Sequence, residues 1–173
     1  TFSRWFFKPY FDIPRNLPKK FYKYLNNNLK IILGFASILK YNEKYWLFCN
    51  IAENDNYSND DELHIFYSDN LLGDNWISHP MNPVVSDVRS SRPAGRVFEY
   101  NGNLYRPSQD CSQHYGFSTK FNKIIKLDEK NYSEKVTEFM SPDWSDEVIS
   151  THTFNHAGKL TVIDAQIKRS KYF

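Results

Sequence analysis

The feature of this sequence that most constrains the fold is a β-hairpin signal that recurs along the chain. In its clearest copy, the tripeptide Asn101-Gly102-Asn103 separates two β-prone runs, residues 96–100 and 104–106. Asn-Gly favours the positive φ angles of a tight turn, so the two runs are expected to pair as antiparallel strands. Similar hairpins centre on residues 41–44 and 156–158, about 55 to 60 residues away on either side.

Further strand-like runs follow the first two hairpins, in the order of a four-stranded antiparallel sheet. The expected strands are residues 31–40, 45–50, 62–68 and 76–78, then 97–100, 104–106, 115–126 and 133–139, and finally 151–155 and 159–164. Repetition of one such unit predicts an all-β fold made of four-stranded blades of a β-propeller. A β-sandwich is the alternative, because it also consists of short strands with frequent turns.

Length and composition indicate one globular domain. Of its 173 residues, 40% are hydrophobic and 17% aromatic, which is enough for a packed core. Three prolines in residues 1–28 break any long element there and leave room for one short helix or strand, and the blades are expected to occupy residues 29–173. The 22 basic and 20 acidic residues nearly balance, which disfavours nucleic acid as a partner. No apolar run is long enough for a membrane span, and a cytoplasmic location is expected.

Neither a metal nor a cofactor is predicted. The histidines lack zinc-ligand spacing, and the acidic run 55–62 lacks the glycine and spacing of an EF-hand, so a solvated loop is the better interpretation of that run. No glycine-rich phosphate loop occurs. Two cysteines, Cys49 and Cys111, fit a reduced compartment better than a disulfide framework, with a single long-range bridge as the alternative.

Polar side chains crowd around the central hairpin. Arg92 precedes it, and Arg106, Gln109, Asp110 and Tyr115 follow its second strand. Guanidinium, amide, carboxylate and phenol groups suit a polyhydroxylated or anionic ligand, because each hydroxyl or phosphate oxygen needs a directed partner. The alternative is a solvated loop with an Arg–Asp surface pair.

The first strand of each propeller blade faces the central axis, which makes Ser37, Arg92 and His152 the side chains expected to face a ligand. We expect Arg106, Gln109, Asp110 and Asp164 to lie behind them. Pro107 is expected to end its strand, so that Gln109 and Asp110 leave the sheet plane.

Three residues are candidates for catalysis. Glycoside hydrolysis commonly needs two carboxyl groups, and Asp110 and Asp164 are the pair that the sequence offers. His152 is a candidate general base or sugar-hydroxyl partner. The structural alternatives are an Asp110 paired with a nearby arginine, an Asp164 that caps a strand end, and a His152 that is simply buried.

Several longer motifs carry a family resemblance. They are R-P-A-G at residues 92–95, L-Y-R-P-S-Q-D-C-S-Q-H-Y-G at 104–116, and T-H-T-F-N followed by V-I-D between 151 and 164. These motifs resemble the N-terminal domain of glucosamine inositolphosphorylceramide transferases and the related bacterial five-bladed propellers of the glycosidase family 43/32 type.

The resemblance implies a domain that recognises or processes carbohydrate in surface-glycan or glycolipid metabolism. If the domain is enzymatic, the resemblance implies an association with glycoside hydrolase or glycosyltransferase activity. The implied ligand is a sugar, sugar phosphate or glycan held near the propeller axis. A non-catalytic scaffold that binds a partner protein is the alternative. Five blades need roughly 250 to 300 residues at this repeat length, so we expect the missing blades to come from a longer chain or from self-association.

Overall fold

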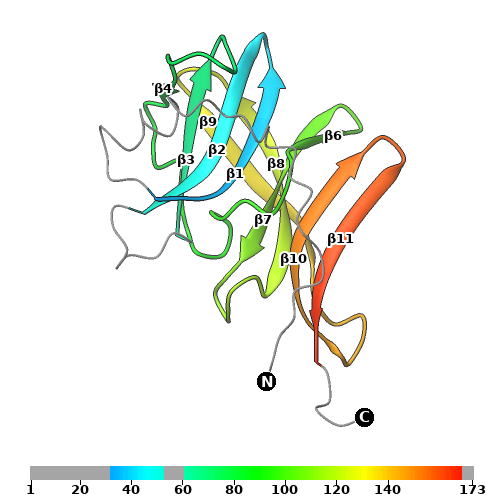
Figure 1. Cartoon of the computed structure of the whole chain (residues 1–173). Helices are drawn as coiled ribbons and strands as arrows, with labels where there is room; N and C mark the ends of the chain where they lie inside the picture. Colours follow the sequence, from blue (N-terminus) through cyan, green and yellow to red (C-terminus); the bar gives the residue numbers. More distant parts are fainter. Residues whose placement is uncertain (1–31, 53–60, 169–173) are drawn as a thin grey trace.

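A computed structural model of the protein describes residues 32–52 and 61–168, and every regular element within these ranges is a β-strand. The strands form three antiparallel sheets that follow one another along the chain (Figure 1). The predicted all-β class is therefore confirmed. The segment 1–28 and most of the acidic run lie outside the described residues.

Each sheet is built largely from strands that are consecutive in the sequence. The first contains β1 (Ile32–Tyr41), β2 (Lys44–Ala52), β3 (Glu62–Ser68) and β4 (Ile77–Ser78) in that order, and β5 (Val85–Ser86) pairs with β3. The second contains β6 (Phe98–Tyr100), β7 (Asn103–Asp110), β8 (Ser118–Leu127) and β9 (Tyr132–Met140). The third contains β10 (Val148–Ala157) and β11 (Leu160–Ile167). A five-stranded, a four-stranded and a two-stranded antiparallel sheet in succession match the predicted partial propeller.

The hairpin turns have the backbone conformation that their residues predict. Asn101 and Gly102 have φ angles of 49° and 71°, and Asn42 and Glu43 have φ angles of 49° and 60°. Positive φ at both central residues gives a turn whose twist matches that of the flanking strands. The expected hairpins at these two places are confirmed.

The predicted break at Pro107 is wrong. Strand β7 continues through Pro107 to Asp110, and Pro107 lies opposite Phe121 of β8. A proline remains in a strand where its missing N–H is not needed. Here the Pro107 carbonyl accepts a hydrogen bond from the Ala94 N–H at 3.0 Å, and a bridge joins Pro93 to Ser108. Gln109 and Asp110 therefore stay in the sheet and point to opposite faces.

The sheets pack in series, each against the next. Trp46, Phe48 and Ile65 of the first sheet share one core with Ile124 and Tyr132 of the second. The opposite face of the second sheet meets the third through aromatic contacts, in which the Phe98 and Phe121 rings lie 5.3 and 4.7 Å from that of Phe154. Because the second sheet is covered on both faces, the arrangement is not a two-sheet sandwich.

The aromatic core residues divide between these layers. Trp46 and Phe48 lie between the first and second sheets, whereas Phe98 and Tyr105 stack on the face toward the third. Phe66 instead joins Leu47, Cys49 and Trp76 on the other face of the first sheet. Residues that alternate along β2 therefore serve two separate cores.

The segments that begin the three sheets lie side by side. The Val97 N–H donates to the Ser37 hydroxyl at 3.3 Å, and the Phe154 N–H donates to the Ala94 carbonyl at 2.8 Å. Gly95 permits this approach, because a Cβ built at this residue would lie 1.9 Å from the Phe154 carbonyl oxygen. Its φ of 146° also disfavours any residue with a side chain.

Replacing Gly95 should therefore destabilise the contact between the second and third sheets. We expect Gly95→Ala to lower the free energy of unfolding by roughly 3 to 5 kcal/mol, because backbone atoms must separate. Gly102→Ala is the matched control, since Gly102 also has positive φ but no atom within 4 Å of the added Cβ, and its cost should be about 1 to 2 kcal/mol. Urea unfolding measures both. Equal losses in the two variants would contradict the close approach at Gly95.

Candidate functional site

Tyr115 lies at the centre of a polar cluster formed by the second and third sheets. Its hydroxyl accepts a hydrogen bond from Arg92 Nη2 at 3.0 Å and lies 3.0 Å from His152 Nε2. The Arg92 guanidinium carbon lies 4.8 Å from the centre of the Tyr115 ring, which is within cation–π range. Three residues far apart in sequence thus meet at one phenol.

Asp164 extends the cluster behind His152. Its Oδ2 lies 3.6 Å from His152 Nδ1, and its Oδ1 accepts the backbone N–H of Thr153. The carboxylate favours the tautomer with hydrogen on Nδ1, which leaves Nε2 to accept the Tyr115 hydroxyl. Hydrogen bonds then run in one direction, from Arg92 to Tyr115 and from Tyr115 to His152, with the carboxylate at the end.

The environment of Asp164 keeps this carboxylate ionised. Burial by itself raises the pKa of Asp164, but the nearby His152 and the hydrogen bond from Thr153 outweigh burial and lower it below its usual value. A negative charge behind His152 is therefore the resting state near neutral pH.

Buried polar contacts fix the position of His152. Gln109 Nε2 donates to the His152 carbonyl at 3.1 Å, and Thr119 Oγ1 donates to the Thr151 carbonyl at 3.1 Å. Gly116 lets the loop pass over the imidazole, since a Cβ there would lie 2.8 Å from His152 Cδ2. The imidazole is thus held from both β7 and the loop after it.

The members of the cluster differ in exposure. Arg92 and His152 are 5% and 8% exposed, whereas Tyr115 is 42% exposed. Tyr115 lies in the loop between β7 and β8, where the Phe117 N–H closes a turn on the His114 carbonyl at 3.2 Å. The phenol is therefore the exposed member of the cluster, with the guanidinium and the imidazole buried behind it.

Arg106 lies in a different place from the one expected. It is fully buried, and its Nε and Nη2 bind the two carboxylate oxygens of Glu134 at 2.8 and 2.6 Å. Its Nη2 and Nη1 also donate to the carbonyls of Ser90 and Ser91. Burial opposes the charge of Arg106, but Glu134 more than compensates and raises the pKa of the guanidinium.

Asp110 is also engaged elsewhere, and its expected arginine partner is wrong. Its Oδ2 pairs with Lys120 Nζ at 2.9 Å, and its Oδ1 accepts the hydroxyl and the N–H of Ser112. Burial raises the pKa of Asp110, but these hydrogen bonds outweigh it and lower the pKa. Because Arg106 and Asp110 share one face of β7 and Gln109 the other, the strand separates them from His152.

The Ser37 side chain forms a hydrogen bond with the backbone. This side chain is 5% exposed, and its hydroxyl accepts the Val97 N–H that joins the first and second sheets. Of the eight residues predicted for the site, the structure brings together Arg92, Tyr115, His152 and Asp164, with Gln109 supporting them.

Two partners went unrecognised in the sequence, Glu134 for Arg106 and Lys120 for Asp110. The sequence separates Glu134 from Arg106 by a hairpin, and only the register of β7, β8 and β9 brings them together. A strict face assignment along β7 is the signal that could have placed Arg106 away from Gln109.

The part of the chain that the structure describes contains neither a metal-binding cluster nor a disulfide. No three His, Cys, Asp or Glu side chains there gather in an arrangement that could hold a metal ion. Cys49 and Cys111 do not form a disulfide, and burial raises the pKa of the Cys49 thiol to about 12. Among the described residues, no helix could cross a membrane.

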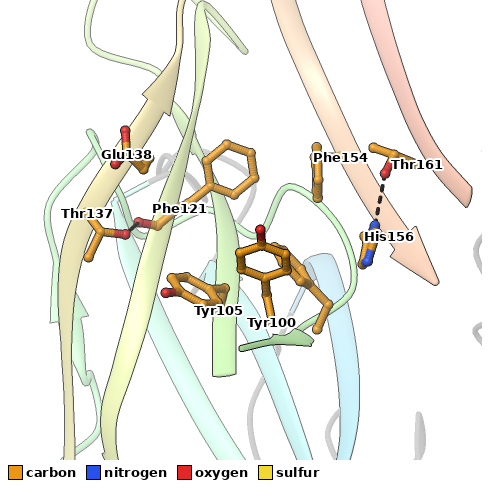
Figure 2. A pocket seen from close by; sticks show the side chains of 9 residues that line it. Tyr100, Tyr105, Phe121, Thr137, Glu138, Phe154, His156 and Thr161 are labelled. Atoms are coloured by element: carbon orange, nitrogen blue, oxygen red, sulfur yellow. Dashed lines mark hydrogen bonds between the residues drawn. The ribbon is translucent and has the colours of Figure 1, made fainter. Parts of the chain in front are cut away.

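A concavity, the aromatic groove, opens between the second and third sheets (Figure 2). It has a volume of about 510 Å³ and is lined by Phe98, Tyr100, Tyr105, Phe121, Thr137, Glu138, Phe154, His156 and Thr161. Apolar rings form most of its walls. It differs in character from the cluster around Tyr115, where ionisable and hydrogen-bonding groups meet.

Comparisons with known proteins identify relatives. Residues 22–166 match the family described as glucosamine inositolphosphorylceramide transferase 1, N-terminal. A rice protein (Oryza sativa subsp. japonica) named glucosamine inositolphosphorylceramide transferase 1 is 39% identical over 101 residues, which cover 57% of this chain and 13% of the relative. The Arabidopsis thaliana protein of the same name is 34% identical over 113 residues, covering 64% of this chain and 15% of the relative.

The chain thus spans about a seventh of the length of these curated relatives. Among solved structures, the Bombyx mori GH32 beta-fructofuranosidase BmSUC1 aligns with a TM-score of 0.44 and 16% identity, over 75% of this chain and 28% of that one. The family match extends over most of the 173 residues and agrees with the motifs seen in the sequence. The chain belongs to the family of N-terminal domains of glucosamine inositolphosphorylceramide transferase 1.

Proposed function

We propose that this domain recognises carbohydrate, as the sugar or sugar-phosphate headgroup of a glycolipid, at the cluster of Arg92, Tyr115 and His152. The observation that carries the proposal is the Tyr115 hydroxyl, which lies 3.0 Å from both Arg92 Nη2 and His152 Nε2. Guanidinium, phenol and imidazole are groups that bind hydroxyl and phosphate oxygens with defined geometry.

The arrangement of the cluster favours binding because its side chains are already ordered. Arg92 packs on the Tyr115 ring, and Gln109 holds the backbone of His152. A ligand that meets preordered groups does not bear the entropic cost of fixing them. The partly exposed phenol offers both a ring face for sugar C–H groups and a hydroxyl for a polar contact.

The charge states favour recognition over hydrolysis by two carboxyl groups. Such hydrolysis needs one carboxyl group with a raised pKa as general acid. The pKa values of Asp110 and Asp164 are both lowered, and each carboxylate is bound to neighbours of the same chain. We therefore assign Asp164 a positioning role behind His152, and Asp110 a role in holding the loop after β7.

The relatives support the ligand class. Their name, glucosamine inositolphosphorylceramide transferase 1, contains a sugar and a phosphate-bearing lipid, and the proposal carries this chemistry over to the present chain. A role in surface-glycan or glycolipid metabolism follows within the same proposal.

Removing the Tyr115 hydroxyl should weaken ligand binding. A screen of immobilised glycans, sugar phosphates and sugar nucleotides identifies a ligand, and calorimetry then compares variants. We expect Tyr115→Phe to lose about 1.5 to 3 kcal/mol, roughly tenfold to a hundredfold in affinity, because the hydroxyl joins two side chains of the site. Tyr100→Phe is the matched control, since Tyr100 is 57% exposed on β6, where it pairs with Asn103 at the far end of β7 from Tyr115. Unchanged binding in Tyr115→Phe and Arg92→Ala, with the fold intact, would remove the cluster from the site.

The charge of Asp164 should give stability a specific pH dependence. Because the folded pKa of Asp164 is lowered, its stabilising effect is fully present above the unfolded value of about 3.9 and is lost as the pH falls through the folded pKa. Asp164→Asn should therefore be less stable than the wild type at pH 7, and the gap should narrow below about pH 4.

Urea unfolding at several pH values measures this difference. Asp146→Asn, at an exposed position in the loop before β10, is the control and should follow the wild-type curve. If the difference in stability between the wild type and Asp164→Asn stays constant from neutral to acidic pH, the carboxylate stabilises the fold through its shape and not through its charge.

A further inference from the structure

The proton of the Tyr115 hydroxyl can take one of two directions in the cluster. Arg92 Nη2 lies 3.0 Å from the phenol oxygen and can only donate, because a guanidinium group has no acceptor. His152 Nε2 lies 3.0 Å from the same oxygen and donates or accepts according to its tautomer. The tautomer of His152 therefore decides whether the phenol proton points toward the imidazole or away from it.

Asp164 selects that tautomer. Its Oδ2 lies 3.6 Å from His152 Nδ1, so a proton on Nδ1 is attracted by the carboxylate, whereas a lone pair on Nδ1 would be repelled. Its Oδ1 accepts the backbone N–H of Thr153, which holds the carboxylate in this orientation. With hydrogen on Nδ1, neutral His152 accepts the Tyr115 proton at Nε2. Asp164 thus acts through His152 as a positioning residue for the phenol.

The direction of this proton restricts what a ligand can offer to Tyr115. A hydroxyl group donates one hydrogen bond and accepts up to two. Because its one proton is directed to His152, any further polar group that contacts the Tyr115 oxygen must be a donor. A sugar hydroxyl can donate, whereas the oxygens of an ionised phosphate only accept and would bring two acceptor oxygens together.

The charges and the exposure of the cluster favour the same class of ligand. Arg92 carries a positive charge and Asp164 a negative one, so with a neutral His152 the described residues of the cluster hold no excess positive charge for an anion. Arg92 is 5% exposed, and its guanidinium packs on the Tyr115 ring. The phenol, which is 42% exposed, is therefore the group that a ligand can reach most easily.

We propose that the cluster selects an uncharged sugar, bound through a hydroxyl that donates to Tyr115, and discriminates against sugar phosphates. This inference rests on the proposed function and narrows it, since that function includes both sugar and sugar phosphate. The selecting element is the hydrogen bond from Tyr115 to His152, which Asp164 keeps in one direction. A site with a fixed hydrogen-bond direction disfavours a ligand of the opposite kind, because the mismatch leaves polar groups without partners.

The tautomer of His152 can be measured without any ligand. Long-range nitrogen–proton NMR spectra at pH 8, above the ordinary histidine pKa of about 6.5, show which ring nitrogen carries the proton, and His152→Gln identifies the signals. We expect the proton on Nδ1 in the wild-type domain. Asp164→Asn should move it to Nε2, because Thr153 holds the amide oxygen and thereby turns the NH₂ group toward Nδ1. Asp146→Asn, at an exposed position, is the control and should leave the tautomer unchanged.

Calorimetry at the same pH measures the selectivity with matched probes. The probes are glucose, N-acetylglucosamine and inositol, each with its monophosphate, together with inorganic phosphate. We expect the wild type to bind an uncharged probe about tenfold more tightly than its monophosphate, and Asp164→Asn to lose or reverse this preference. Circular dichroism checks that the variant folds. If it does not fold, Tyr115→Phe takes its place and should abolish the preference, because it lacks the hydroxyl.

Three results overturn the inference. The first is a wild-type His152 with its proton on Nε2. The second is a wild-type domain that binds the monophosphates as tightly as the uncharged probes or more tightly; if Tyr115→Phe and Arg92→Ala weaken that binding, the selectivity falls and the proposed function stands. The third is a domain that binds none of the probes, which contradicts the inference and the proposed function together.

Discussion

The alternation of side chains along β7 is the constraint on which the site depends. Arg106 points toward the first sheet and pairs with Glu134, while Gln109 points toward the third and holds the His152 backbone. One strand thus places a buried ion pair on one side and a support for the polar cluster on the other. A shift of register by one residue would exchange the two faces and dismantle both.

Buried polar groups carry much of the contact among the three sheets, and most have partners close by. Ser37, Ser108, Thr119 and Asn122 are buried and form hydrogen bonds to backbone or side-chain atoms. A buried polar group without a hydrogen-bond partner lowers the stability of the fold more than an apolar side chain would. A buried polar group with a partner favours a single arrangement of the chain. Hydrogen bonds near the start of each sheet, together with the apolar cores, therefore determine how the sheets lie against one another.

Local signals in the sequence predicted the strands well, and long-range contacts account for what was missed. Asn101-Gly102 determines its hairpin through backbone conformation alone, so the turn was predictable. Pro107 was misinterpreted because a strand tolerates a proline where no neighbour needs its N–H, and here the Pro107 carbonyl still pairs by accepting the Ala94 N–H. The partner of Arg106 depends on the register of three strands, which no local pattern contains. Tyr115 and His152 were predicted as site residues, but their direct contact was not.

The cluster around Tyr115 bridges two sheets that also meet through aromatic rings, side-chain hydrogen bonds and close backbone contacts. Arg92 and Tyr115 precede and follow strands of the second sheet, whereas His152 and Asp164 belong to the third. Any molecule that binds across this junction joins the sheets to each other, and any force that parts the sheets must also release the molecule. Binding of such a molecule and the contact between the two sheets are therefore thermodynamically linked, and each stabilises the other by the same free energy.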